Sequence, residues 1–167
     1  MVKSNIKAVS ASAVVSMVMV LGTAAAHADD SHWVPGAACE AIDGKYASQV
    51  VGGFGAVGNK NTGGNLSVSC PIAPNHFGYS TMDVSVSVTK TSAASMTCAE
   101  VGRDFSNSAG VLTSQSVSGA GTKSFNFSGL DTQTWLFHSV RCDIPKAGST
   151  SPSSRTTLNG YNYLEYN

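Results

Sequence analysis

The chain has 167 residues, with 10 Lys and Arg and 10 Asp and Glu, and its formal net charge is zero at pH 7. Nucleic-acid-binding domains are usually strongly basic, so we expect no nucleic-acid partner. Residues 13–21 are mostly apolar but are interrupted by Ser16. This stretch is shorter than the roughly 18 residues of a membrane-spanning helix, so we expect no span in the mature chain.

Residues 1–28 have the three parts of a secretory signal peptide. Two lysines give a positive start, an apolar segment follows, and small residues form a cleavage site that ends at Ala28. We therefore expect a single domain over residues 29–167 that is secreted or periplasmic. This mature chain has 8 basic and 10 acidic residues, and so a formal net charge of −2.

All four cysteines lie beyond the expected cleavage site: Cys39, Cys70, Cys98 and Cys142. An even number of cysteines in an exported chain predicts two disulfides. Three pairings are possible, and we prefer Cys39 with Cys70 and Cys98 with Cys142 because this gives two separate loops of moderate length. No pair has the short spacing of a zinc site, so we expect neither a structural metal nor a cofactor.

Period-two alternation predicts β-strands along most of the mature chain. In residues 80–90, Met, Val, Val and Val share one face while Asp, Ser, Ser and Thr share the other, which is typical of a half-buried strand. Turns rich in Gly, Asn, Asp and Pro separate such segments, and no segment has a helical period. In chain order, strands are expected at residues 45–51, 54–57, 65–70, 80–90, 95–101, 123–127, 134–142 and 158–166.

This pattern predicts an all-β protein, namely an antiparallel β-sandwich of about seven to nine strands with two disulfides. A small outer-membrane β-barrel is an alternative. Barrel strands need about 9–11 alternating residues, and most segments here are shorter. The Ser-rich segment 146–154 is expected to be a mobile connection within the same domain.

Several segments read in order, VPGAAC, SVSCPI, MTC, WLFHSVRCDIP and LNGYNYLE, form a recognisable pattern. It resembles small exported bacterial proteins of uncharacterised function, with Pro-Gly then Cys, Cys-Pro, a mid-chain Cys, Cys-x-Ile-Pro and a final Gly-Tyr strand. The resemblance spans nearly the whole mature chain. It implies a β-sandwich with paired cysteines and implies no activity.

Residues 134–142 contain the first candidate ligand contacts. If Cys142 forms a disulfide across the core, its face is buried and Trp135 and Phe137 lie on the other face. A strand that is apolar on both sides is usually covered on both faces, and we expect this here. An exposed Trp135–Phe137 pair would instead indicate a binding surface.

Tyr161 and Tyr163 in the last strand are the second candidates. Their rings could stack on sugar rings while the amides of Asn159 and Asn162 bind hydroxyls. The same spacing is also typical of an ordinary edge strand, because strands are enriched in tyrosine regardless of ligands.

Motifs for catalysis are absent from the sequence. Residues 53–58 match G-x-G-x-x-G, but no helix is expected after them, so we expect a glycine-rich turn rather than a dinucleotide site. No nucleophile elbow or His-Glu-x-x-His run occurs. The sequence therefore favours a non-enzymatic binding or surface-interaction module whose partner is an extracellular glycan or protein. The alternative is a small extracellular hydrolase that uses His138 or His76 with a nearby acid.

Overall fold

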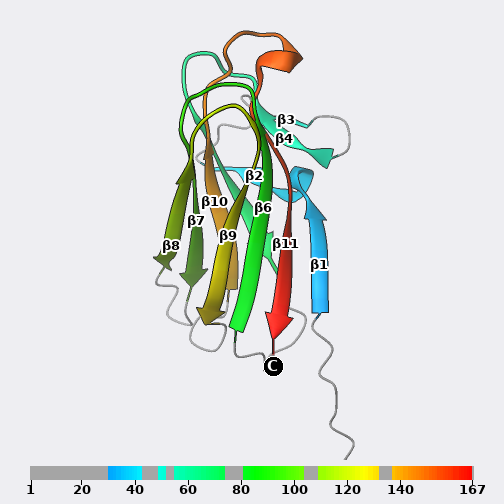
Figure 1. The fold of residues 1–167 in the computed structure, drawn as a ribbon, viewed down its shortest axis with the longest axis vertical. Coiled ribbons are helices and arrows are strands. Elements are labelled where there is room, and N and C mark those ends of the chain that lie inside the picture. The colour runs from blue at the N-terminus through cyan, green and yellow to red at the C-terminus, as the bar shows by residue number, and fades with distance from the viewer. Residues whose placement is uncertain are drawn as a thin grey trace, which may run out of the picture.

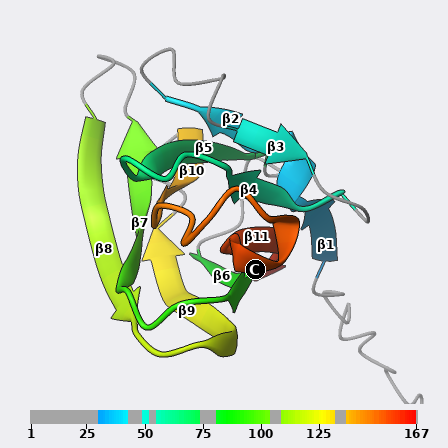
Figure 2. The same cartoon turned by 90° about the horizontal axis from the view of Figure 1, so that it is seen from above.

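The computed structural model describes residues 30–42, 49–51, 55–73, 81–103, 109–131 and 137–166. Within these ranges the chain forms two antiparallel sheets that pack face to face (Figures 1 and 2). The predicted all-β sandwich with two disulfides is thus confirmed. None of the described residues belongs to a helix long and apolar enough to cross a membrane.

One sheet has six strands and the other has five. The six-stranded sheet has the order β3 (Gln49–Val51), β4 (Val57–Asn59), β11 (Thr157–Tyr166), β6 (Thr81–Lys90) and β9 (Gly121–Asp131), and β1 (Asp30–Pro35) also pairs with β11. The five-stranded sheet has the order β2 (Glu40–Ala41), β5 (Leu66–Ile72), β10 (Phe137–Ile144), β7 (Met96–Arg103) and β8 (Ala109–Val117). Two short 3-10 turns, η1 (Gly36–Ala38) and η4 (Pro152–Ser154), lie in the connections.

Three of these strands were not predicted: β1, β2 and β8. β8 lies at an edge of its sheet, and none of its side chains is fully buried, so it lacks the alternation that marks a half-buried strand. The interpretation of the last strand as an edge strand is wrong. β11 pairs with β6 on one side and with β1 and β4 on the other, so it lies inside its sheet.

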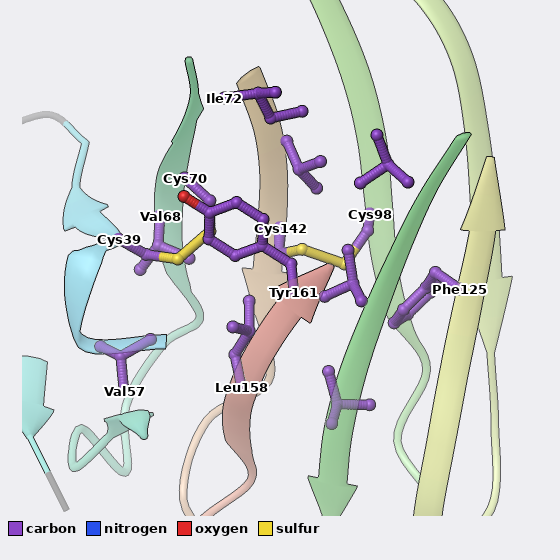
Figure 3. Close-up of a cluster of buried hydrophobic side chains, with 14 of the residues drawn as sticks. Cys39, Val57, Val68, Cys70, Ile72, Cys98, Phe125, Cys142, Leu158 and Tyr161 are labelled. Carbon is purple, nitrogen blue, oxygen red and sulfur yellow. A yellow bond between two sulfur atoms is a disulfide. The ribbon is translucent and has the colours of Figure 1, made fainter. Parts of the chain in front are cut away.

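The inward-facing residues of both sheets form one core, part of which Figure 3 shows. The preferred cysteine pairing is confirmed, since disulfides join Cys39 to Cys70 and Cys98 to Cys142. Cys98 and Cys142 lie directly opposite each other in β7 and β10, and Cys39 precedes β2, which pairs with β5. Both bridges therefore link neighbouring segments on the side of the five-stranded sheet, and neither crosses the core, which is the arrangement that we considered for Cys142.

The Ser-rich connection before β11 is a closed loop held by local hydrogen bonds. The backbone N–H of Ser149 donates to Ser154 Oγ at 3.0 Å, and the backbone N–H of Ser154 donates to the carbonyl of Ser151 at 3.1 Å. The Arg155 guanidinium donates to the carbonyl of Thr150 at 2.8 Å. Short hydroxyl side chains bond readily to nearby backbone, which explains why this Ser-rich segment forms hydrogen-bonded turns.

Candidate functional site

Tyr161 and Tyr163 lie in the core, with exposed fractions of only 1% and 5%. The Tyr161 hydroxyl donates to the carbonyl of Pro71, and the Tyr163 hydroxyl donates to the carbonyl of Ala73 at 2.9 Å. Figure 3 shows Tyr161 among the buried side chains. Burial also raises the pKa of Tyr161 to about 12. The prediction that these two rings stack on a sugar is therefore wrong, and they tie β11 to the chain of the opposite sheet.

The other two predicted aromatic contacts have different outcomes. Trp135 lies outside the described residues. Phe137 begins β10, opposite Arg103 of β7, and its side chain is 66% exposed. The expectation that this strand is covered on both faces is thus wrong at Phe137. One ring of the predicted pair does lie on the surface of the five-stranded sheet.

His138 forms a buried pair with an acid, as a hydrolase would need, but inside the core. Its Nδ1 lies 2.7 Å from Glu100 Oε1, and both side chains have no exposed surface. A substrate cannot reach this imidazole in the folded protein, so the pair has a structural role. His76, the other candidate base, lies outside the described residues.

The glycine-rich segment after β3 does not precede a helix. Gly55 has a φ of +75°, which favours glycine, and β4 starts two residues later and pairs with β3 and β11. This is a turn that enters a strand, as we expected. Residues 52–54 are outside the described ranges. Among the described residues, no group of three or more His, Cys, Asp or Glu side chains could hold a metal ion.

An aromatic side chain that sequence reasoning missed lies on the outer face of the six-stranded sheet. Trp33 of β1 is 65% exposed. It lies opposite Asn162 of β11, and its indole covers the bare backbone of Gly160, where an added Cβ would lie 3.0 Å from Trp33 Cζ2. Gly160 thus provides the space in which the indole rests on the sheet while its other surface stays in solvent. Aromatic rings reach diagonal neighbours in this way across antiparallel pairs.

A row of small polar side chains extends across the sheet from Trp33. Asn162 lies opposite Ser85 of β6, which lies opposite Asn126 of β9. With neighbouring strands about 4.8 Å apart, the four residues span roughly 14 Å. We call Trp33, Asn162, Ser85 and Asn126 the Trp33 platform.

Serine hydroxyls fix both amides of the platform. Ser31 Oγ donates to Asn162 Oδ1 at 3.1 Å, and Ser85 Oγ donates to Asn126 Oδ1 at 2.8 Å. Within the described ranges, the side-chain nitrogens of Asn162 and Asn126 have no hydrogen-bond partner. The platform therefore presents two oriented N–H donors to solvent beside an exposed ring.

Other polar residues of this face are already engaged. The amide of Asn159, which we predicted to bind hydroxyls, donates to Thr89 Oγ1 at 3.0 Å and accepts from Thr157 Oγ1 at 3.2 Å. Asp83 accepts from the backbone of Gly129 at 2.8 Å and from the Tyr166 hydroxyl at 3.0 Å. The free polar groups of the platform itself are neutral, so its chemistry suits an uncharged ligand rich in hydroxyls.

No protein-family model and no curated protein sequence matches the chain. Among solved structures, the CBM36-1 domain of a multidomain xylanase from the hindgut metagenome of Trinervitermes trinervoides has a TM-score of 0.50 and 12% identity, over 81% of this chain and 96% of that domain. Carbohydrate-binding module CBM36 in complex with calcium and xylotriose has a TM-score of 0.48 and 14% identity, over 80% of this chain and 98% of that one. The xylan-binding module CBM15 has a TM-score of 0.47 and 10% identity, over 82% and 97% of the two chains. At these identities the first likeness shows the fold: this chain is a β-sandwich similar to a carbohydrate-binding module.

Proposed function

We propose that the protein is an exported, non-catalytic module that binds a neutral glycan on the Trp33 platform. One observation carries the proposal: the exposed indole of Trp33 rests on Gly160, beside two amides whose oxygens are fixed and whose N–H groups face solvent. The likeness of the sandwich to a module of a xylanase supports a binding role. Because a fold by itself does not imply a function, we assign the site residues from the structure of this chain and not by analogy with that module.

The two parts of the platform match the two surfaces of a sugar. The apolar C–H face of a pyranose ring packs on an indole, which combines a large apolar surface with low conformational entropy. Hydroxyl oxygens of the same or a neighbouring ring accept from the amides of Asn162 and Asn126. A span of roughly 14 Å over four strands makes room for more than one sugar ring.

Export is part of the same proposal. Two disulfides persist in an oxidising compartment and rarely in the cytosol. The apolar segment and the small-residue site before Ala28 supply the signal for that route. A secreted or periplasmic location would also bring the module into contact with extracellular glycans.

A glycan array with purified residues 29–167, followed by calorimetric titration of the best neutral oligosaccharide, tests this function. We expect Trp33→Ala to weaken binding about 5- to 150-fold, the range that corresponds to the roughly 1–3 kcal/mol contributed by a nucleobase stacked on an aromatic side chain. Asn162→Ala should weaken it less, and Trp33→Phe should keep part of it. Thermal unfolding of each variant separates loss of binding from loss of fold.

Phe137→Ala is the matched control, since Phe137 is as exposed as Trp33 but lies on the other sheet. Equal losses in Trp33→Ala and Phe137→Ala would contradict the placement of the site. A screen of ester and peptide substrates run on the same sample tests the hydrolase alternative. Turnover that disappears in His138→Ala, with the fold retained, would overturn the non-catalytic proposal.

A further inference from the structure

The outer face of the five-stranded sheet contains a shallow groove of about 380 Å³. Its floor is formed by the small outward side chains of β5, β7, β8 and β10, among them Ser69, Ser139 and Val101. Val111 of β8 borders it and is 67% exposed. The groove residues belong to the five-stranded sheet and the Trp33 platform to the six-stranded sheet, and both sets point outward, so the groove is a separate surface. Figure 2 shows the two sheets as separate layers.

Among the described residues that line the groove, two are arginines and none is an acid. Arg141 lies in β10, the middle strand of the five, between Ser69 on one side and Ala99 on the other. These small neighbours leave the guanidinium exposed, and it makes no hydrogen bond or ion pair with any described residue. We call this surface the arginine groove.

Arg103, the second arginine, lies four residues along β7 from Ala99 and opposite the exposed Phe137. Four residues of strand extend roughly 14 Å, so the two guanidinium groups bracket the hydroxyl of Ser139 and the apolar side chains between them. An extended ligand in the groove would therefore meet a cation at each end and a ring beside one of them.

Two acids lie near the groove on the same face, but neither forms an ion pair with Arg141. Asp143, the next outward residue of β10 beyond Arg141, instead accepts a hydrogen bond of 2.5 Å from Ser67 Oγ. Glu40 lies opposite Ser69, so its backbone is roughly 10 Å from that of Arg141, across two strand spacings. Within the described residues, the Arg141 guanidinium therefore has no ion-pair partner that a ligand would have to displace.

We infer that the arginine groove binds a carboxylate-bearing polysaccharide, that is, a polymer of uronic acid sugars. Arginine presents a planar set of donors that grips a carboxylate with two parallel hydrogen bonds. The hydroxyls of Ser69 and Ser139 match sugar hydroxyls, and the exposed ring of Phe137 gives an apolar surface for a sugar ring. An acidic peptide fits less well, because the floor lacks the deep apolar pocket that would anchor a peptide side chain.

Affinity electrophoresis and calorimetry with polygalacturonate test the inference, and the fully methyl-esterified polymer serves as the uncharged comparison. We expect the wild type to bind the acid form, to bind the ester at least about tenfold more weakly, and to lose affinity in 1 M salt. Arg141→Gln should weaken binding of polygalacturonate at least about tenfold, and Arg141→Lys should recover only part of it. Lys60→Gln removes an equal charge from an exposed loop residue outside the groove and should change little.

This result is separable from the proposed function. Trp33→Ala should leave binding of polygalacturonate unchanged, and Arg141→Gln should leave neutral-glycan binding unchanged. Wild-type affinity in Arg141→Gln, or equal affinity for the acid and the ester, would overturn the inference. Binding of polyglutamate as tight as that of polygalacturonate would also overturn it, in favour of an acidic peptide.

Discussion

The buried pair of Glu100 and His138 gives a prediction whose size follows from the structure. Glu100 lies opposite Val140, and His138 lies opposite Gly102, so the imidazole and the carboxyl group are diagonal neighbours across β7 and β10. Neither side chain is exposed, and Glu100 Oε2 has no hydrogen-bond partner within the described part of the chain. Glu100 therefore depends on His138 for compensation of its buried polarity.

Breaking a buried pair by removing one partner costs about 3–5 kcal/mol. We expect Glu100→Met and His138→Leu each to lose free energy of unfolding in that range. The double variant replaces the pair by apolar groups of similar volume, which is often neutral or stabilising. The free energy of unfolding of the double variant should therefore fall by at least about 2 kcal/mol less than the two single losses added together.

Guanidinium unfolding of the oxidised protein at pH 7 measures the four free energies of this cycle. Any other contact of His138 is lost equally in the single and the double variant, so it cancels from the coupling energy. Additive losses would refute the reasoning, because they would mean that the two side chains do not compensate each other. A control cycle on Glu100 and the distant, exposed Lys60 should be additive.

Three more predictions concern the glycine under Trp33, the buried tyrosine and the disulfides. Gly160→Ala places a methyl group 2.8 Å from the carbonyl oxygen of Val34, and thermal unfolding should show a loss of stability of about 1–3 kcal/mol. In the control Gly64→Ala the nearest atom lies at 3.9 Å, so stability should change by less than about 0.5 kcal/mol. Equal effects of the two substitutions would contradict this account. Because burial raises the pKa of Tyr161 from 10.0 to about 12, the unfolded chain ionises first, so stability should fall as pH rises from 10 towards 12, and Tyr161→Phe should flatten this fall in denaturant titrations at each pH. Paired Cys→Ala changes that remove either the Cys39–Cys70 bridge (sequence separation 31) or the Cys98–Cys142 bridge (separation 44) should each lower the free energy of unfolding by about 4 kcal/mol in the loop-entropy model. An unchanged unfolding midpoint would exclude this stabilisation.

Local patterns in the sequence were sufficient for the strands that have one buried and one exposed face. The alternation from Met82 to Val88 predicted β6 because successive side chains of a strand point to opposite faces, whatever lies beside it. The even number of cysteines predicted two bridges for a similar reason, since an exported thiol seldom stays reduced. The sandwich follows from these local rules, because each strand must bury its apolar face against another layer.

Only the tertiary structure decided which faces and strands meet, and this defines the candidate sites. The sequence placed aromatic rings beside Asn162, but it could not show that the exposed ring is Trp33 of β1 and that the tyrosines of β11 point inward to carbonyls of the opposite layer. Likewise, Arg103 and Arg141 share a groove because β7 and β10 are neighbours. Strand pairing is non-local: alternation fixes two faces for each strand, but the choice of neighbour depends on the packing of the whole chain.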